Sequence, residues 1–382
     1  MHDELNMDGG NARSMVGERE KALFYLSNHA DNICSVKFCS EDVLISTCDC
    51  GMVTLWDLNN LTSTGNYKVS NYSALYASLF DKDHFFVKTK EGSVKLWDIE
   101  RNHCAVKLDA NNYTYAKPYS VNGNIVTPVN HNGDIAIYDL RTQTNLPRNN
   151  TLCNDWDKGS SNRLVIRFNK IKKSVGKIKM ISLNGKQKEI KSILNSELKL
   201  CSDVLDIYPV PFWGDSFILA CYEPSLFLIY DFRMTNQLVS SFTIDVKENV
   251  LSYHINKNKC VVSTSNNSVY SLTLGQNEEV CLVKKAHCPK YNMTNLVIRS
   301  DSKVFISITD NCSINICDLH HMEVIDCIKT YKFNCFNFVD FHPFSGLFAV
   351  AEQNKVSIWA NQASSFELPP SSGDHSEVVP LG

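Results

Sequence analysis

The residues of this chain that could do chemistry are mainly its 15 Cys and 11 His. These side chains bind zinc or act in nucleophilic catalysis only at particular spacings. His320 and His321 follow Cys312 and Cys317 closely, but the sequence contains no Cys-x-x-Cys pair. It also lacks a Gly-x-Ser-x-Gly nucleophile turn and a phosphate-binding glycine loop. We therefore expect no catalytic residue, no metal, no cofactor and no small-molecule substrate, and so no enzyme.

One segment differs in charge from the rest of the chain. The chain has 38 Lys+Arg and 41 Asp+Glu, a net charge of −3, whereas residues 163–191 hold ten basic residues and one acid. The strand-like run 164–166 and the turn at Asn184-Gly185 predict a protruding hairpin here. Its lysines either protect an exposed sheet edge or dock an acidic partner. Nucleic acid is not expected, because only Phe168 is interleaved with the charges. The candidate contacts are Lys170, Lys172, Lys173, Lys177 and Lys179.

A second candidate surface is aromatic. Phe212-Trp213 precedes Gly214, and Tyr222-Glu223 follows a short apolar run. These residues either belong to the apolar core or form an exposed anchor for a partner protein.

The elements that position these residues repeat along the chain. A turn glycine, alternating apolar residues, an aromatic residue and Asp recur at 51–58, 92–99 and 133–140. The three aspartates, Asp57, Asp98 and Asp139, follow one another at intervals of 41 residues. Weaker copies follow at 228–232, 268–274, 314–319 and 356–360. A period near 42 residues with alternating patterning predicts four-stranded β-sheet units arranged as a propeller.

The number of units is seven or eight. The interval from Asp139 to Asp231 is 92 residues, about two periods, and 177–183 could end an eighth unit. Residues 142–163 are polar and contain no strand pair before that run, so we favour seven blades with a basic insertion at 142–197. We expect 23–26 to supply the outer strand of the last blade, because this closes the ring and removes a free edge.

In these motifs the chain resembles the WD-repeat β-propeller family. That resemblance implies an all-β, seven-bladed fold in which a His, a Ser or Thr, a turn Asp and a Trp bond one another within a blade. In the first unit the matching residues are His29, Ser46, Asp49 and Trp56.

A narrower resemblance comes from the second half of the chain. The segments 219–223, 228–231, 296–303, 339–341, 347–351 and 356–359 resemble the G-protein β-subunit-like proteins, whose fungal members are the ASTRA-associated WD-repeat proteins. Cys221 and Pro224-Ser225 depart from the pattern of that family. The resemblance implies a scaffold that acts with the TTT cochaperone assembly in maturation of phosphatidylinositol-3-kinase-like kinases and in chromatin complexes. The alternatives are an adaptor of a ubiquitin ligase or trafficking assembly, and an esterase-like propeller of diphthamide synthesis.

Composition bounds the rest of the interpretation. The chain is 43% hydrophobic and 21% charged and contains no apolar run of membrane-spanning length, so no membrane partner is expected. Residues 1–20 are polar and do not predict a secretory signal, so we expect the cytoplasm and nucleus and reduced cysteines. We expect disorder at 1–20 and 362–382 around a propeller at 21–361.

Overall fold

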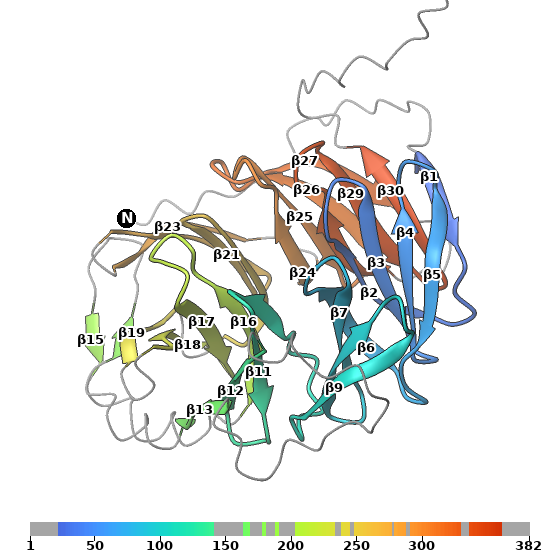
Figure 1. The fold of residues 1–382 in the computed structure, drawn as a ribbon. Helices are drawn as coiled ribbons and strands as arrows, with labels where there is room; N and C mark the ends of the chain where they lie inside the picture. The colour runs from blue at the N-terminus through green and yellow to red at the C-terminus, as the bar shows by residue number, and fades with distance from the viewer. Residues whose placement is uncertain are drawn as a thin grey trace, which may run out of the picture.

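Alternating apolar residues in each repeat form antiparallel strands, and turn residues join them. The computed structural model describes residues 22–140, 163–168, 178–180, 188–190, 203–233, 238–244, 248–276, 279–287, 291–329 and 336–360. The regular elements in these ranges are β-strands grouped in seven sheets. Figure 1 shows the sheets arranged as blades around a common centre. The prediction of an all-β, seven-bladed propeller is therefore confirmed.

The first six blades are each built from strands that follow one another in the chain, with the first of them innermost. The first blade contains β2 (Ile33–Phe38), β3 (Val43–Cys48), β4 (Met52–Asp57) and β5 (Thr62–Lys68). The second contains β6 (Ala74–Leu79), β7 (His84–Thr89), β8 (Ser93–Asp98) and β9 (His103–Asp109). The third contains β10 (Tyr119–Val121), β11 (Asn124–Val129), β12 (Asp134–Asp139) and β13 (Arg163–Ile166). The fourth contains β16 (Val204–Pro209), β17 (Phe217–Tyr222), β18 (Leu226–Asp231) and β19 (Leu238–Thr243). The fifth contains β20 (Val250–Asn256), β21 (Lys259–Thr264), β22 (Ser268–Leu274) and β23 (Val280–His287). The sixth contains β24 (Met293–Ile298), β25 (Val304–Thr309), β26 (Ser313–Asp318) and β27 (Val324–Lys329).

The seventh blade joins the two ends of the propeller. It consists of β28 (Phe336–Phe341), β29 (Leu347–Glu352), β30 (Lys355–Ala360) and, outermost, β1 (Phe24–Ser27). Tyr25 pairs with Ser357 in an antiparallel ladder, so the first and last strands lie side by side (Figure 1). The predicted closure by the N-terminal strand is confirmed, and it covers the edge that β30 would otherwise leave unpaired.

The tryptophans of the repeat occupy equivalent positions. Trp56, Trp97 and Trp359 lie on β4, β8 and β30, each the third strand of its blade. Before β4, the turn requires glycine at Gly51, whose φ is 79° and whose added Cβ would lie 2.2 Å from the carbonyl oxygen of Ser70. A side chain there would meet both backbone strain and a steric clash.

The basic segment is divided between two blades. β13 pairs with β12 and completes the third blade. β14 (Ile178–Met180) and β15 (Lys188–Ile190) pair with each other, and β14 adds to β19 in parallel, so the fourth sheet has six strands. This differs from the single hairpin containing 164–166 that the sequence predicts. The physical reason is that β12 has an open edge, and residues 163–166 satisfy its backbone hydrogen bonds.

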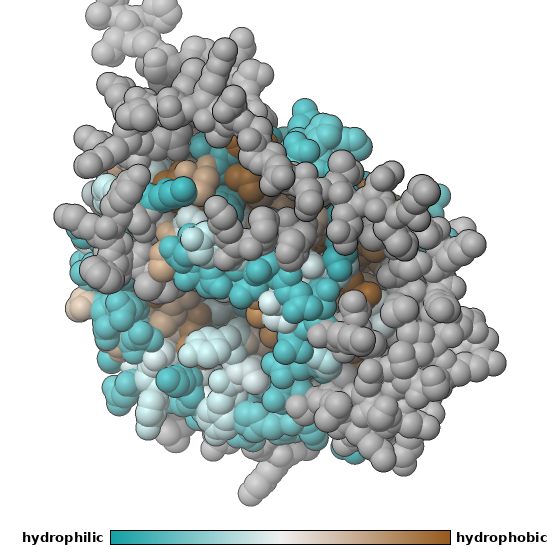
Figure 2. Space-filling view, turned by 180° about the vertical axis from the view of Figure 1, so that it is seen from behind, coloured by the Kyte–Doolittle hydropathy of each residue, from teal (hydrophilic) through white to brown (hydrophobic). Residues whose placement is uncertain are grey.

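The hydrophobic core lies between neighbouring blades. Val53 and Leu55 of the first blade, for example, pack in one buried cluster with Phe85 and Val87 of the second. On the side opposite to that of Figure 1, the surface formed by the described residues is mostly hydrophilic, with small hydrophobic areas between the polar residues (Figure 2). Within the described ranges there is no helix long and apolar enough to cross a membrane.

Candidate functional site

One face of the ring carries the candidate site. Neighbouring strands in a blade are antiparallel, so the connection from second to third strand and the connection to the next blade lie on the same face. We call the part of it formed by the first three blades the loop face. It comprises the connections 49–51, 69–73, 90–92, 110–118 and 130–133.

Three exposed tyrosines lie on the loop face. Tyr72, Tyr113 and Tyr115 are 60%, 52% and 75% exposed. The Tyr113 ring stacks on the His131 ring of the next connection, with centroids 5.4 Å apart and planes at 13°. Large exposed aromatic side chains are costly to leave in water, and they are common anchors of protein interfaces.

A buried lysine of the second blade holds the connection 110–118 through hydrogen bonds. Lys88, on β7, is fully buried, and its Nζ donates hydrogen bonds to Oδ1 of Asn112 at 2.9 Å and to the carbonyl oxygen of Ala116 at 2.8 Å. Nδ2 of Asn112 in turn donates to the carbonyl oxygen of Asn130 at 2.8 Å. Thr114 donates to Asn112 Oδ1 from both its backbone N–H and its hydroxyl. The backbone that carries Tyr113 and Tyr115 is therefore tied to two blades.

Burial changes the acid–base chemistry of Lys88. Removal from water lowers its pKa from the ordinary 10.5 to about 7, although the carboxylate of Asp206 favours the charged form. A lysine is kept in such a place only when its hydrogen-bond donors are used, and here they hold the connection.

An ion pair holds the end of the same connection. Lys117 donates from its backbone N–H to Oδ1 of Asp206 at 2.9 Å, and its Nζ lies 3.7 Å from Oδ2. The ammonium also sits 4.4 Å from the ring centroid of Phe338. Burial lowers the pKa of Lys117 and raises that of Asp206, and in each residue the charge of the other opposes the shift. The contact joins the 110–118 connection to the fourth and seventh blades.

A second ion pair closes the ring at its inner strands. Nζ of Lys37 on β2 lies 3.2 Å from Oδ1 of Asp340 on β28, and Oδ2 of Asp340 accepts a hydrogen bond from the backbone N–H of Phe38 at 2.8 Å. This pair connects the first blade directly to the seventh.

Three of the four residues matched to the WD-repeat set are joined by hydrogen bonds. Nε1 of Trp56 donates to Oγ of Ser46 at 2.7 Å, and that oxygen lies 2.6 Å from Nε2 of His29. Asp49 is exposed and instead accepts from Sγ of Cys34, while Nδ1 of His29 has no hydrogen-bond partner. Burial lowers the pKa of His29 to about 4, so the imidazole is neutral at pH 7. The set is a structural support of the first blade beside the loop face.

The predicted aromatic surface does not form. Tyr222 is fully buried, its hydroxyl lies 3.1 Å from the Tyr230 hydroxyl, and its ring stacks on Phe168, so its prediction as a partner anchor is wrong. Trp213 packs against the core and donates from Nε1 to the carbonyl oxygen of Gly275 at 2.7 Å. The reason is that the apolar run before Tyr222 is the second strand of a blade, enclosed by neighbours on both faces.

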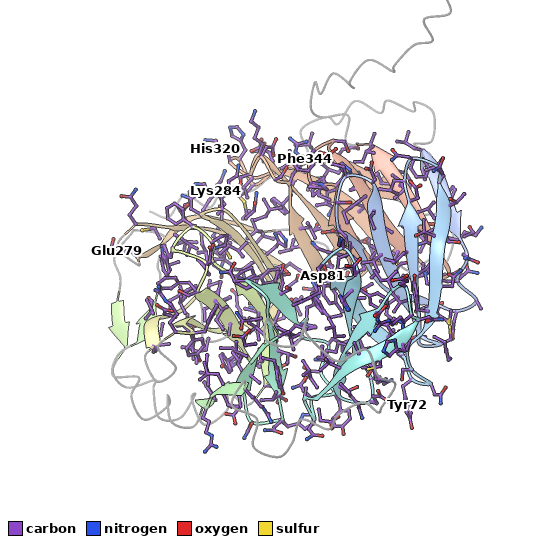
Figure 3. The ribbon with its side chains drawn as sticks, in the orientation of Figure 1. Tyr72, Asp81, Glu279, Lys284, His320 and Phe344 are labelled. Atoms are coloured by element: carbon purple, nitrogen blue, oxygen red, sulfur yellow. The ribbon has the colours of Figure 1, made fainter. Side chains whose placement is uncertain are left out.

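Phe212 and Glu223 are exposed but lie on opposite faces. Phe212 is in the connection from first to second strand of the fourth blade, whereas Glu223 is in the connection from second to third. Figure 3 shows the two faces: Tyr72 of the loop face lies at the lower edge, and Phe344, in another connection from first to second strand, lies at the upper edge.

The predicted basic contacts fall mostly outside the described residues. Lys170, Lys172, Lys173 and Lys177 lie there, and Lys179 is on β14, next to β19. Among the described residues, no group of three His, Cys, Asp or Glu side chains is arranged to hold a metal ion.

Reasoning from the sequence alone missed the tyrosines of the loop face. Two features could have pointed to them. The segment 111–115, Asn-Asn-Tyr-Thr-Tyr, places two tyrosines in a polar connection between strands. Lys88 is a charged residue that directly follows the apolar run 85–87 within β7.

The fold of this chain is similar to that of a solved β-propeller domain. No protein-family model and no curated protein matches the chain. Among solved structures, the β-propeller domain of Myceliophteria thermophila Cps50 (Swd1) is similar, with a TM-score of 0.65 and 12% sequence identity over 90% of this chain and 99% of that one. At this identity the similarity concerns the fold. The chain is therefore a seven-bladed β-propeller, similar in architecture to a solved propeller domain across nearly its whole length.

Proposed function

We propose that this chain is a non-catalytic scaffold that binds a partner protein through the loop face. The observation that supports this most is the combination of exposed and fixed groups: Tyr113 and Tyr115 point to solvent from a backbone that the buried Lys88 holds. Association costs less when the contact residues are already ordered before binding. A rigid pair of tyrosines is therefore a favourable anchor for a partner.

The partner itself is proposed from the sequence. The resemblance of 219–223, 228–231, 296–303, 339–341, 347–351 and 356–359 to the ASTRA-associated WD-repeat proteins supports subunits of the TTT cochaperone assembly as partners, in the cytoplasm and nucleus. The basic segment 163–191 is a second proposed contact, for an acidic surface of the same partner.

Affinity purification from cells tests the scaffold function. Tagged wild-type chain is compared with the double variant Tyr113→Ala/Tyr115→Ala and with the control Tyr25→Ala, which removes a tyrosine of similar exposure (52%) on the outer strand β1. We expect mass spectrometry to identify a partner that wild type and control recover equally and the double variant recovers at least about tenfold less, since one aromatic anchor is worth about 2 kcal/mol or more. Equal recovery by all three would remove the loop face as the docking surface.

The identity of the recovered protein tests the narrower proposal separately. TTT subunits among the partners support it, whereas subunits of a ubiquitin ligase or a trafficking coat would replace it with the adaptor function.

A further inference from the structure

Two cysteines of the first blade have their sulfurs almost in bonding contact. Cys48 ends β3, Cys50 follows in the turn, and the two Sγ atoms are 3.0 Å apart. A disulfide bond is about 2.05 Å long, so a movement of about 1 Å would join them.

The surrounding turn keeps the pair in place. The backbone N–H of Gly51 donates to the carbonyl oxygen of Cys48 at 3.0 Å, and Val69 donates to the carbonyl oxygen of Gly51 at 3.0 Å. Nζ of Lys68 donates to the carbonyl oxygen of Cys50 at 2.5 Å. These bonds hold the backbone on both sides of Cys50, and with it the two sulfurs near each other.

The two thiols differ in their access to solvent. Cys48 is fully buried, whereas Cys50 is partly exposed. A reagent in solution therefore reaches Cys50 first, and Cys48 is available only to a group already bound beside it.

We propose that Cys48 and Cys50 form a reversible intramolecular disulfide by exchange with a small-molecule disulfide. The Cys50 thiolate attacks one sulfur of the reagent, forms a mixed disulfide and releases one thiol. Cys48 then attacks Sγ of Cys50, the proton of Cys48 passes to the departing thiolate, and a second thiol leaves. The protein dithiol loses two protons and two electrons, and the reagent disulfide takes them up to give two thiols.

The second step depends on proximity. Burial, with the thiol of Cys50 as a neighbour, raises the pKa of Cys48 to about 12, so little of it is thiolate at neutral pH. Holding the reacting sulfurs together compensates for this, because a positioned group reacts as if at very high concentration. We expect ring closure to become faster as the pH rises from 7 to 9.

The position gives this chemistry a consequence. The turn 49–51 belongs to the loop face and packs against 69–73, where the carbonyl oxygen of Tyr72 lies 2.5 Å from the place a Cβ on Gly51 would take. A disulfide would therefore form beside the segment of the loop face that carries Tyr72. The inference goes beyond the proposed function, and its test measures covalent state only.

Alkylation and peptide mass spectrometry test the proposal. The full chain is incubated with oxidised glutathione, quenched in acid, denatured, alkylated with iodoacetamide and digested with trypsin. Cleavage after Lys37 and Lys68 gives one peptide that contains Cys39, Cys48 and Cys50, while Cys34 falls in another. We expect the oxidised peptide to carry one alkyl group, on Cys39, and to be two hydrogens lighter than the reduced form at the other two cysteines. Dithiothreitol should restore three alkyl groups.

Variants assign the bond. Cys50→Ser and Cys48→Ser should each abolish the loss of two labels, whereas Cys39→Ser and the exposed control Cys281→Ser should retain it. Three alkyl groups on the wild-type peptide at every glutathione concentration would overturn the proposal. So would a bond that links Cys34 to this peptide, or persistence of the bond in Cys50→Ser.

Discussion

Nζ of Lys88 lies 2.9 Å from Oδ1 of Asn112, and both side chains are buried. This single contact links the second strand of the second blade to the connection that leads into the third. Because Asn112 also donates to the carbonyl oxygen of Asn130, strand β7 and the connections 110–118 and 130–133 share one hydrogen-bonded centre. The display of Tyr113 and Tyr115 thus depends on a residue that no partner would touch.

Lys88→Met should loosen this connection. Methionine keeps the length of the side chain but removes the donor to the carbonyl oxygen of Ala116, which costs about 1–3 kcal/mol for a buried group. It also leaves Thr114 alone as the donor to Asn112 Oδ1. We expect faster amide hydrogen exchange in 110–118 and weaker binding of the partner. The exposed Lys82→Met, in the connection from first to second strand on the opposite face of the same blade, is the matched control and should change neither. Unchanged exchange in Lys88→Met would show that the connection is held by other contacts.

Trp56→Ala should destabilise the first blade by about 3–5 kcal/mol, because it creates a cavity and removes the donor to Ser46. Trp56→Phe should cost less, about 1–2 kcal/mol, since it keeps most of the apolar contact and the Ser46–His29 hydrogen bond. Thermal and urea unfolding measure the difference. Equal stability of wild type and Trp56→Ala would contradict the role of this set.

Acid should weaken the fold through His29. Its pKa is about 4 in the fold and 6.5 when unperturbed, so the unfolded chain binds more protons between these values. The stability from neutral His29 is complete above pH 6.5 and is lost as the pH falls through this window toward 4. Urea unfolding at pH 7.5, 5.5 and 4.5 should show a smaller loss in His29→Gln than in wild type. The exposed His320→Gln serves as control and should follow wild type.

The basic segment should contribute to binding through charge. Replacing Lys170, Lys172, Lys173, Lys177 and Lys179 by Ser should slow association with an acidic partner and reduce its dependence on salt. The propeller should stay folded, because surface substitutions typically cost within about 0.5 kcal/mol each. Pull-downs at low and physiological salt measure this. If wild-type and five-serine protein recover the partner equally at both salt concentrations, the segment is not part of the binding surface.

Local patterns in the sequence were enough to predict the blades. The 41-residue interval between Asp57, Asp98 and Asp139 and the alternation around each of them are properties of short segments, and each of the first six blades is built from one such segment. The closing strand was also predictable, since a ring with a free β30 edge would expose unpaired backbone groups.

The binding face was decided by tertiary structure. Tyr222 and Tyr113 both lie near strand ends in the sequence, yet one is buried between blades and the other is exposed. The sequence separates Lys88 from its acceptors by 24 and 28 residues, and Asp206 from Lys117 by 89. Only the packing of blade against blade brings these groups together. Burial and charge pairing depend on which segments become neighbours, and a periodic pattern specifies the blade without specifying the contacts between its connections.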